Sequence, residues 1–570
     1  MFLIIIISII CSFDHVQPQS TPAQLRSPSV TNFSLSNPLL FYVPPQDTPS
    51  LNHISLNLCS APNSQPIDYQ FNNILIVSNS SDNKTPSPDK LPARSKTSIL
   101  SHQSSAGDYS DLRAGIASVS LVNSVGLWIS IQPPNPAQSW SFQLGVSNQT
   151  PLHASNNFPA LKLDDTDGSN ALLTAADSSV FLPVTAKNPP STQEFVPIIL
   201  PTPDNLQLGL AGSLCYLQSI IANQSSESKT QLERISITPS LTSRTTGVGS
   251  FSSQPTGNAT DHDYRISDQA AGLRTQYLIN NLNPALNYSA WFFQPGPLVD
   301  NVQTGRLWPY INFRTKSSKN CRLVHDLPFC PSVAYAVPAS TSQSTTSLVE
   351  MYNRTVSEHL ANFRTVVSTY PCNNDTSGRY SFVTGCGDCL RAYTDWVCGM
   401  TMPRCTDPPP PPAPSTPTIQ QSMDSQMVFT RTEPNNSRTP NLTEKSVYPY
   451  AELPPCGSLC TLVAATCPPL IGWNCPLPGV TSNFSYRDPR TLGPLDLAGG
   501  QQSLNGFGGE RAQDRFGNVF CNALESDIVY ARMGSANRIL NPSSVSALLI
   551  IITSHLLASL LSGIPLLPFL

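Results

Sequence analysis

The strongest constraint on how this chain folds is a block of cysteines between Cys321 and Cys521. The block holds twelve of the fifteen cysteines in a chain of 570 residues. In an oxidising compartment such cysteines pair and hold a domain together, whereas the same spacings in a cytosolic protein would indicate zinc. Whether these cysteines form disulfides or bind zinc therefore depends on whether the chain is secreted.

The N-terminus is typical of a secretory signal. Phe2 to Cys11 is an apolar run, which is too short to span a bilayer but matches the core of a signal peptide. We assign residues 1–12 to the signal, with cleavage near Ser12 and a retained signal anchor as the alternative.

The C-terminal segment 534–570 is predicted to carry an anchor. The small residues Gly534, Ser535 and Ala536 are followed by a spacer and by an apolar tail from Val545 to the chain end, as in a glycosylphosphatidylinositol signal. A transmembrane helix would normally be followed by Lys or Arg, and none follows here. A retained helix and a peripheral segment remain the alternatives.

Composition agrees with an extracellular glycoprotein. Only 12% of the residues are charged, 55 are proline, and the net charge is −4, which argues against nucleic-acid binding. Without Cys11 in the signal, fourteen cysteines remain, an even number. Two of them lie outside the block, so we expect Cys59 to pair with Cys215. The other expected disulfide cysteines are Cys321, Cys330, Cys372, Cys386, Cys389, Cys398, Cys405, Cys456, Cys460, Cys467, Cys475 and Cys521.

The N-terminal half is predicted to be β-structure after a disordered leader at 13–50. A β-rich domain is expected at 51–214, where Trp140, Phe142, Leu144 and Val146 alternate as one apolar face. A second β-sandwich is expected at 215–316. Many short strands separated by turn residues favour sandwiches.

A tyrosine corner is the clearest cue in this second sandwich. The segment from Leu282 to Tyr288 resembles the corner strand of fibronectin type III domains, in which the Tyr hydroxyl bonds back to the upstream backbone. Generic strands with a coincidental pattern are the alternative. Either interpretation makes the region β, with Tyr310 to Thr315 as its last strand.

The cysteine block at 320–533 shows helical periodicity instead. Apolar residues at steps of three and four predict one long amphipathic helix, ended by Pro371. A proline-rich insertion at 406–445 is predicted to be extended and disordered, and a final helix at 519–533 would carry Cys521. The apolar positions of the long helix are Leu348, Tyr352, Val356, Leu360, Phe363, Val367 and Tyr370. The predicted fold is therefore β-sandwich-like domains followed by a disulfide-rich, mainly helical domain.

The sequence contains three motifs that could form a redox or metal site, and the evidence for each is weak. Cys386-Gly-Asp-Cys389 lacks the βαβ context of a redox pair and is interpreted as structural. Asp164 to Gly168 does not fit a calcium loop, because Asp and Glu are missing from its first and last positions, and a polar hairpin turn is favoured. Asp261-His-Asp263 is interpreted as a solvated loop. We therefore predict no enzyme, no catalytic or metal site and no cofactor.

Twelve sequons for N-glycosylation fit secretion. They lie at Asn32, Asn79, Asn83, Asn148, Asn223, Asn258, Asn287, Asn353, Asn374, Asn435, Asn441 and Asn483.

The cysteine block resembles a known family. The opening segment from Asn320 through Cys330 to Pro338 is similar to the cysteine-rich region of the fungal stretch-activated calcium-channel component family, the mating-induced-death proteins. Later landmarks agree, namely Cys386 and Cys389 with Tyr393 and Trp396-Val-Cys398, Pro403-Arg-Cys405, Cys456 to Cys460, Cys467-Pro, Trp473 and Cys475-Pro.

This resemblance implies an auxiliary subunit of a plasma-membrane calcium channel that acts with a large four-repeat pore-forming subunit. It implies calcium influx on stretch, pheromone or secretory stress, at the extracellular face of the plasma membrane, with the endoplasmic reticulum as a further location. We expect the block to dock on the channel through exposed residues. The candidates are Asp326, Tyr335, Tyr393, Asp395 and Trp473, although Trp473 also suits a core position.

Two other functions remain open. A lipid-anchored wall or adhesion glycoprotein without a channel partner would suit the sandwiches and sequons, although no internal repeat of the adhesin kind is present. A frizzled-like lipid-binding module would need an apolar groove that the sequence does not reveal.

Overall fold

The computed structural model describes residues 22–60, 70–79, 107–155, 161–175, 195–242, 274–370, 380–408, 428–434, 447–477, 485–486 and 521–524, apart from gaps of one to three residues. These residues divide into two compact units, which meet in the sequence between Lys319 and Asn320. The predicted signal and the C-terminal anchor lie outside the described residues. Within the described residues, no helix is long and apolar enough to cross a membrane.

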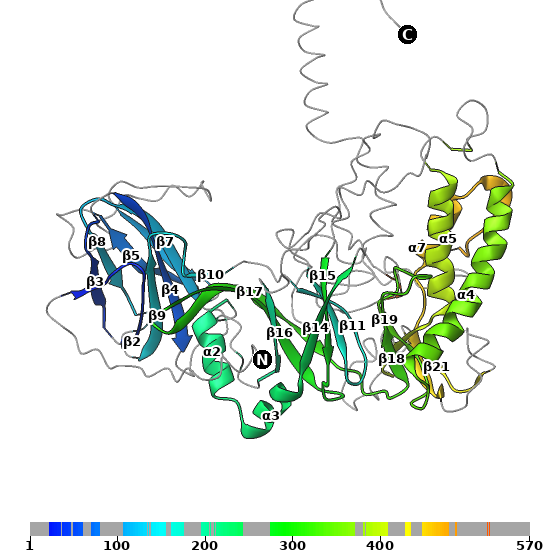
Figure 1. The fold of residues 1–570 in the computed structure, drawn as a ribbon, viewed down its shortest axis with the longest axis horizontal. Coiled ribbons are helices and arrows are strands. Elements are labelled where there is room, and N and C mark those ends of the chain that lie inside the picture. Colours follow the sequence, from blue (N-terminus) through cyan, green and yellow to red (C-terminus); the bar gives the residue numbers. More distant parts are fainter. Residues whose placement is uncertain are drawn as a thin grey trace, which may run out of the picture. The chain divides into compact units, whose positions relative to one another are not determined.

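The first unit begins with a nine-stranded sheet that closes over one core. Phe33 and Phe41 come from strands far apart in the sheet, yet their ring centroids lie 5.3 Å apart. The sheet is therefore folded over on itself (Figure 1). Its strands, in order, are β1 (Ala23–Gln24), β3 (Leu39–Val43), β8 (Leu127–Ile131), β5 (Gln70–Ser78), β6 (Gly107–Arg113), β7 (Ile116–Asn123), β4 (Ser50–Ser60), β9 (Trp140–Ser147) and β2 (Ser29–Leu35).

Of two predictions about this sheet, one is confirmed and the other is wrong. The alternating face of β9 is buried in the core from Trp140 to Val146, as predicted. The prediction of a disordered leader is wrong for residues 23–43, which form β1, β2 and β3. Phe33 and Phe41 enter the core, so tertiary packing overrides the Pro- and Ser-rich local composition.

A two-sheet sandwich follows in the same unit. One sheet orders β10 (His153–Ser155), β17 (Val302–Arg314), β16 (Asn287–Val299) and β13 (Val196–Pro201), and the other orders β11 (Leu161–Thr166), β12 (Ala171–Ala175), β15 (Arg274–Asn280) and β14 (Ser236–Thr242). Residues from both sheets, including Phe292, Trp308 and Tyr277, share one core. Because β12 pairs with β15 and β13 with β16, this sandwich starts well before residue 215, where the sequence analysis placed its boundary.

The tyrosine corner is present. The Asn283 backbone N–H donates to Tyr288 Oη at 2.8 Å. Tyr288 is fully buried at the start of β16 and stacks on Phe313 of β17, with ring centroids 5.7 Å apart. The hydroxyl thus satisfies a backbone donor at the point where the chain turns into the strand.

A disulfide joins the first sheet to a helix of the same unit. Cys59 of β4 is bonded to Cys215 of α2 (Leu214–Ala222), with an S–S distance of 2.02 Å, the pair expected from the cysteine count. Ser213 caps α2 by accepting the Tyr216 N–H, and its hydroxyl donates to the Leu58 carbonyl at 2.8 Å. A second helix, α3 (Ser226–Arg234), follows.

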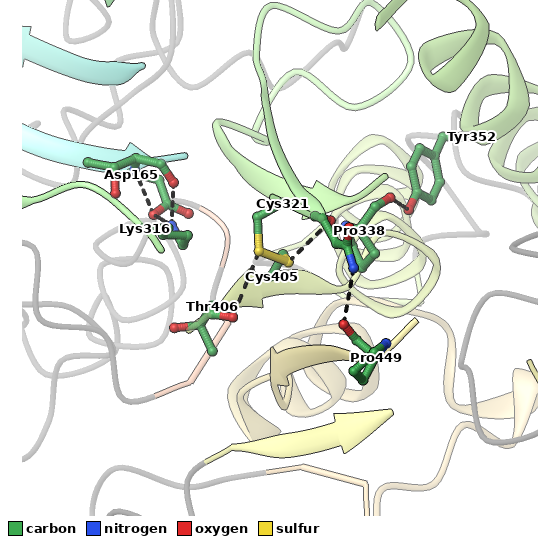
Figure 2. Close-up of a disulfide and its surroundings, with 10 residues drawn as sticks. Asp165, Lys316, Cys321, Pro338, Tyr352, Cys405, Thr406 and Pro449 are labelled. Carbon is green, nitrogen blue, oxygen red and sulfur yellow. Dashed lines mark hydrogen bonds and ion pairs between the residues drawn. A yellow bond between two sulfur atoms is a disulfide. The ribbon is translucent and has the colours of Figure 1, made fainter. Parts of the chain in front are cut away.

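The acidic segment after Leu163 is part strand and part turn, because Asp164 and Asp165 lie in β11 and residues 167–170 form the hairpin turn to β12. Asp167 Oδ1 accepts the N–H groups of Ser169 and Asn170 at 2.8 and 2.7 Å. Asp165 forms a buried ion pair with Lys316 (Figure 2). The interpretation as a polar turn is confirmed for Asp167 and Gly168 and is wrong for Asp164 and Asp165, which are buried in β11. The Asp165 carboxylate serves the packing of the sandwich.

The second unit combines helices with two small sheets. Its helices are α4 (Thr345–Ser368), α5 (Cys386–Thr401), α7 (Gly457–Thr466) and the 3₁₀ turn η7 (Pro469–Ile471). Strand β18 (Cys321–Val324) pairs with β19 (Tyr335–Pro338), and β20 (Arg404–Thr406), β22 (Tyr450–Leu453) and β21 (Phe429–Arg431) form a second sheet. The prediction of a mainly helical domain did not include these strands. It also placed β21 inside the disordered insertion, which is wrong for residues 429–431.

Candidate functional site

The predicted amphipathic helix is α4, and its apolar face organises the second unit. Six of the seven predicted positions, from Leu348 to Val367, are buried, while Tyr370 is only partly covered. Ser344 begins the helix by accepting the Ser347 N–H at 3.2 Å. Phe363 stacks on Tyr393 of α5, with ring centroids 3.6 Å apart. Stacked aromatic rings therefore join α4 to α5.

Helices α5 and α7 approach each other closely at Gly399. A Cβ added at Gly399 would lie 2.9 Å from Leu459 Cδ1. Cys389 of α5 is bonded to Cys467, the C-cap residue of α7. Glycine at position 399 allows the two helices to approach this closely, and the disulfide fixes them in that position.

Disulfides cross-link many segments of this unit, although α4 contains no cysteine. Cys389 is bonded to Cys467 rather than to Cys386, so the Cys-Gly-Asp-Cys segment is not an internal redox disulfide. Each of the thirteen described cysteines is disulfide-bonded, Cys386 included. Four other pairs join described residues of the unit, namely Cys321–Cys405 (Figure 2), Cys330–Cys398, Cys456–Cys521 and Cys460–Cys475.

Cys521 lies in a different local structure from the one predicted. The next residue, Asn522, forms a parallel β-bridge with Pro455, and its N–H donates to the Pro454 carbonyl at 2.8 Å. A helix at 519–533 is therefore wrong at this point, although residues after Leu524 lie outside the described part. The bridge and the disulfide together hold the segment at Cys521 and Asn522 beside the start of α7.

The structure divides the five docking candidates. Tyr335 is fully buried and donates its hydroxyl to the Met402 carbonyl at 2.8 Å. Asp395 is buried and accepts a hydrogen bond from Ser332 Oγ at 2.9 Å. Tyr393 is covered by Phe363 and Trp473. The prediction that these three are exposed is wrong, because each serves the packing between elements.

The two remaining candidates reach the surface to different extents. Asp326 is exposed, has a left-handed backbone (φ 54°) and lies 2.8 Å from His325 Nδ1. Trp473 is half-buried and packs edge-on against Trp396, with ring centroids 4.7 Å apart. Trp396 Nε1 in turn donates to Tyr486 Oη at 2.9 Å. This aromatic cluster fixes the segment after α7 against α5.

Burial controls the electrostatics of the unit. Burial raises the pKa of Tyr393, and it raises the pKa of Tyr352 further, with nearby tyrosines and Glu452 adding to the effect. Glu452 is completely buried in β22, and its Oε1 accepts from Arg431 Nη2 and Nε at 2.6 and 3.0 Å. Sequence analysis missed this pair because Arg431 lies within the predicted insertion.

Among the described residues, no group of three or more His, Cys, Asp or Glu side chains is placed to hold a metal ion. Asp261 and its neighbours lie outside those residues. What the unit offers is a disulfide-linked scaffold that presents surface side chains in fixed positions.

The described sequons differ in exposure. Asn148, Asn223, Asn287 and Asn353 are exposed. Asn32 is half-buried and accepts from Gln143 Nε2 at 2.9 Å, and Asn79 donates to the Val122 carbonyl. Asn83, Asn258, Asn374, Asn435, Asn441 and Asn483 lie outside the described residues. Glycan occupancy stays a prediction.

Comparison with known proteins identifies a family and several relatives that are similar to this chain in sequence. The family model Mid1, described as a stretch-activated Ca2+-permeable channel component, matches residues 52–493. The chain is 28% identical over 353 residues to the stretch-activated cation channel yam8 of Schizosaccharomyces pombe, covering 61% of each chain. It is 25% identical over 368 residues to the stretch-activated cation channel MID1 of Saccharomyces cerevisiae, covering 62% of this chain and 60% of that one.

A third relative and one solved structure complete the comparison. The stretch-activated cation channel MID1 of Cryptococcus neoformans is 26% identical over 418 residues, covering 67% of this chain and 62% of that one. The chain thus spans less than two thirds of the length of these relatives. A pre-peptidase C-terminal domain of Bacillus anthracis collagenase covers 23% of the chain at 6% identity with a TM-score of 0.15, which is too low to support any argument.

Proposed function

The chain belongs to the Mid1 family of stretch-activated Ca2+-permeable channel components, and from this premise we propose that it is an auxiliary subunit of a plasma-membrane calcium channel. Its partner is a large four-repeat pore-forming subunit. It supports calcium influx on stretch, pheromone or secretory stress. The membrane contact is a lipid anchor or a C-terminal hydrophobic segment.

The observation that carries this proposal is the extent of the family match. The match begins within β4 of the first sheet and ends beyond Cys475. It therefore includes most of the first sheet, the two-sheet sandwich and most of the disulfide-linked unit. A channel component built from these parts contributes folded domains with large surfaces rather than the groups that line a conduction path.

The disulfides support a location on the extracellular face. All thirteen described cysteines are paired, and structural disulfides persist in the secretory pathway and outside the cell. The exposed sequons at Asn148, Asn223, Asn287 and Asn353 are accessible to glycosylation on that side of the membrane.

The rival proposal is a lipid-anchored cell-surface or wall glycoprotein without a channel partner. The sandwiches, the sequons and the predicted anchor fit this proposal as well, but it does not explain why the chain belongs to a family of channel components. The two proposals differ in whether a channel subunit is bound.

Affinity purification in mild detergent separates them. The tagged full chain is isolated from fungal membranes, and the eluate is probed for the four-repeat subunit, with an unrelated lipid-anchored glycoprotein as the control. The proposal expects the channel subunit to co-elute with this chain only. A channel that is absent from both eluates, while the tagged protein is recovered intact, would favour the wall glycoprotein.

A further inference from the structure

The first sheet carries buried polar side chains where β4 and β9 run side by side. Leu56 of β4 and Phe142 of β9 point into the apolar core of the sheet. Because side chains alternate along a strand, the next residues, Asn57 and Gln143, lie on the opposite face. Both are 0% exposed, so this face of the two strands is enclosed as well. We call these two side chains the amide pair.

The register of the sheet places the two amides next to each other. Asn57 lies directly opposite Gln143 in the pairing of β4 with β9. Opposed side chains of an antiparallel pair have Cβ atoms about 5 Å apart. Gln143 Nε2 donates to Asn32 Oδ1 of β2 at 2.9 Å, which fixes the orientation of the glutamine.

Two other elements of the same unit cover the amide pair. Two residues further along β4, Cys59 is bonded to Cys215 of α2. Two residues before Asn57, Ser55 Oγ lies 3.0 Å from Nδ1 of the buried His153 in β10. The amide pair therefore lies on the part of the sheet between its contacts with α2 and with β10.

Three polar atoms of the amide pair have no hydrogen-bond partner among the described residues. They are Oδ1 and Nδ2 of Asn57 and Oε1 of Gln143. A buried polar atom without a partner destabilises the folded state, and nearly all such atoms in proteins bond to another protein group or to ordered water. The two amides do not bond to each other although they are neighbours, so another group has to complete their hydrogen bonds.

Another buried asparagine of the same sheet shows how the chain satisfies an amide by itself. Asn123 of β7 is also 0% exposed. Its Nδ2 donates to the Pro44 carbonyl at 2.9 Å, and its Oδ1 accepts the Gly126 N–H at 3.0 Å. Burial of an amide in this sheet therefore does not by itself leave its atoms unpaired.

The chemistry of the three atoms indicates the class of ligand. Two of them are acceptors and one is a donor, so the ligand must both donate and accept hydrogen bonds. The amides carry no charge that would favour an ion. A larger neutral molecule would need an opening to the surface, which the complete burial of both side chains argues against. A buried water makes about three hydrogen bonds, as many as the unpaired atoms require.

We propose that the amide pair is a binding site for ordered water, enclosed between the first sheet and the elements α2 and β10. The water donates to Asn57 Oδ1 and Gln143 Oε1, and the Asn57 Nδ2 group donates to water. Bound water thus links β4 to β9 on this face, where the core side uses apolar packing. The inference is independent of the proposed function, because it concerns the first unit and requires no channel subunit.

Oxygen-17 relaxation dispersion on the purified full chain tests this site, because it counts water molecules that stay bound much longer than surface water. The wild type is compared with a variant that combines Asn57→Leu and Gln143→Leu. Asn123→Leu is the matched control, because it removes a buried amide whose partners are backbone groups. Gln143→Met alone is a milder variant, and the melting temperature of each variant shows that it is folded.

We expect the double variant and Gln143→Met each to lose at least one long-lived water, and Asn123→Leu to keep the wild-type number. The same number of long-lived waters in the wild type and in both folded amide-pair variants would overturn the inference. A loss of the same size in Asn123→Leu would also overturn it, because the signal would then not belong to this site.

A crystal structure of the wild-type full chain is a second readout that needs no variant. We expect an ordered water within about 3 Å of Gln143 Oε1 and of an amide atom of Asn57. A direct hydrogen bond between the two amides, or other protein groups bonded to the three atoms, would overturn the inference. A metal ion coordinated by the two amide oxygens would overturn the choice of water as the ligand.

Discussion

The first unit is expected to lose stability in acid because of one buried imidazole. His153 of β10 is 1% exposed, and its Nδ1 lies 3.0 Å from Ser55 Oγ of β4. Its Nε2 is buried and has no hydrogen-bond partner among the described residues. Gly145 makes room for the ring, since a Cβ there would lie 2.9 Å from it. A proton on Nε2 would therefore add a buried charge without a partner.

The size of the effect follows from the shift in pKa. Burial lowers the pKa of His153 from 6.5 to about 4. Because the folded state binds this proton more weakly than the unfolded chain, the contribution to stability is fully present above pH 6.5 and is lost as the pH falls towards 4. At about 1.36 kcal/mol per pKa unit, the whole effect is about 3.4 kcal/mol. About 2.5 kcal/mol of this is lost between pH 7.5 and pH 4.5.

Hydrogen exchange measured by mass spectrometry tests this locally, which suits a chain of several domains. Peptides from β4 and β9 report the opening free energy of the first unit at pH 7.5 and 4.5, after correction for intrinsic exchange. His153→Gln cannot titrate, so the wild type should lose about 2.5 kcal/mol more than the variant. His53→Gln, at a partly exposed position, is the control and should keep most of the wild-type pH dependence. An identical pH dependence in the wild type and His153→Gln would refute the reasoning.

Three other substitutions test the packing. Tyr288→Phe should cost about 1 kcal/mol, because the corner hydrogen bond is lost, as measured by exchange in β16. Glu452→Ala should cost about 3 kcal/mol, because Arg431 is left without its buried partner, and should lower the melting temperature of the purified chain more than Glu452→Gln does. Replacing Cys460 and Cys475 together by Ser should cost about 3 kcal/mol in urea unfolding, because the cross-link closes a 15-residue loop; a loss below 1 kcal/mol would show that the segment is held mainly by its aromatic contacts.

Local patterns in the sequence predicted the elements that depend on local physics. The steps of three and four that end at Val367 predicted α4, because one face of a helix repeats at that spacing. The alternation from Trp140 to Val146 predicted β9 and its apolar face for the same kind of reason, although most of the polar face of β9 is buried as well. Tyr288 was predicted to form a corner because its partner lies only five residues upstream.

Features that depend on distant pairing were not predictable in this way. The boundary at residue 215 failed because β12 and β15 pair across about a hundred residues of sequence. The prediction that Tyr335 and Asp395 are exposed was wrong. Their hydrogen-bond partners, Met402 and Ser332, come from other elements and cannot be foreseen from the local sequence. Residue type alone does not tell an interface aromatic from a core aromatic.

The residues of α7 and η7 also combine a feature that the sequence shows with one that it does not. The absence of charge after Gly457 is visible in the sequence. The exposure of Leu470 and the burial of Ile471 beside it are not, because both are apolar residues of one short turn. Only the structure shows which of the two faces outward.

We propose that the disulfide-linked unit is what makes this chain a working channel component. The most direct measurement is stretch-evoked calcium influx in a fungal strain that lacks its own family member, with surface delivery monitored by labelling of intact cells. We expect the full chain to restore the influx, and we expect a chain lacking residues 320–533 to reach the surface without restoring it. Restored influx with the shortened chain at the surface would refute this role of the disulfide-linked unit.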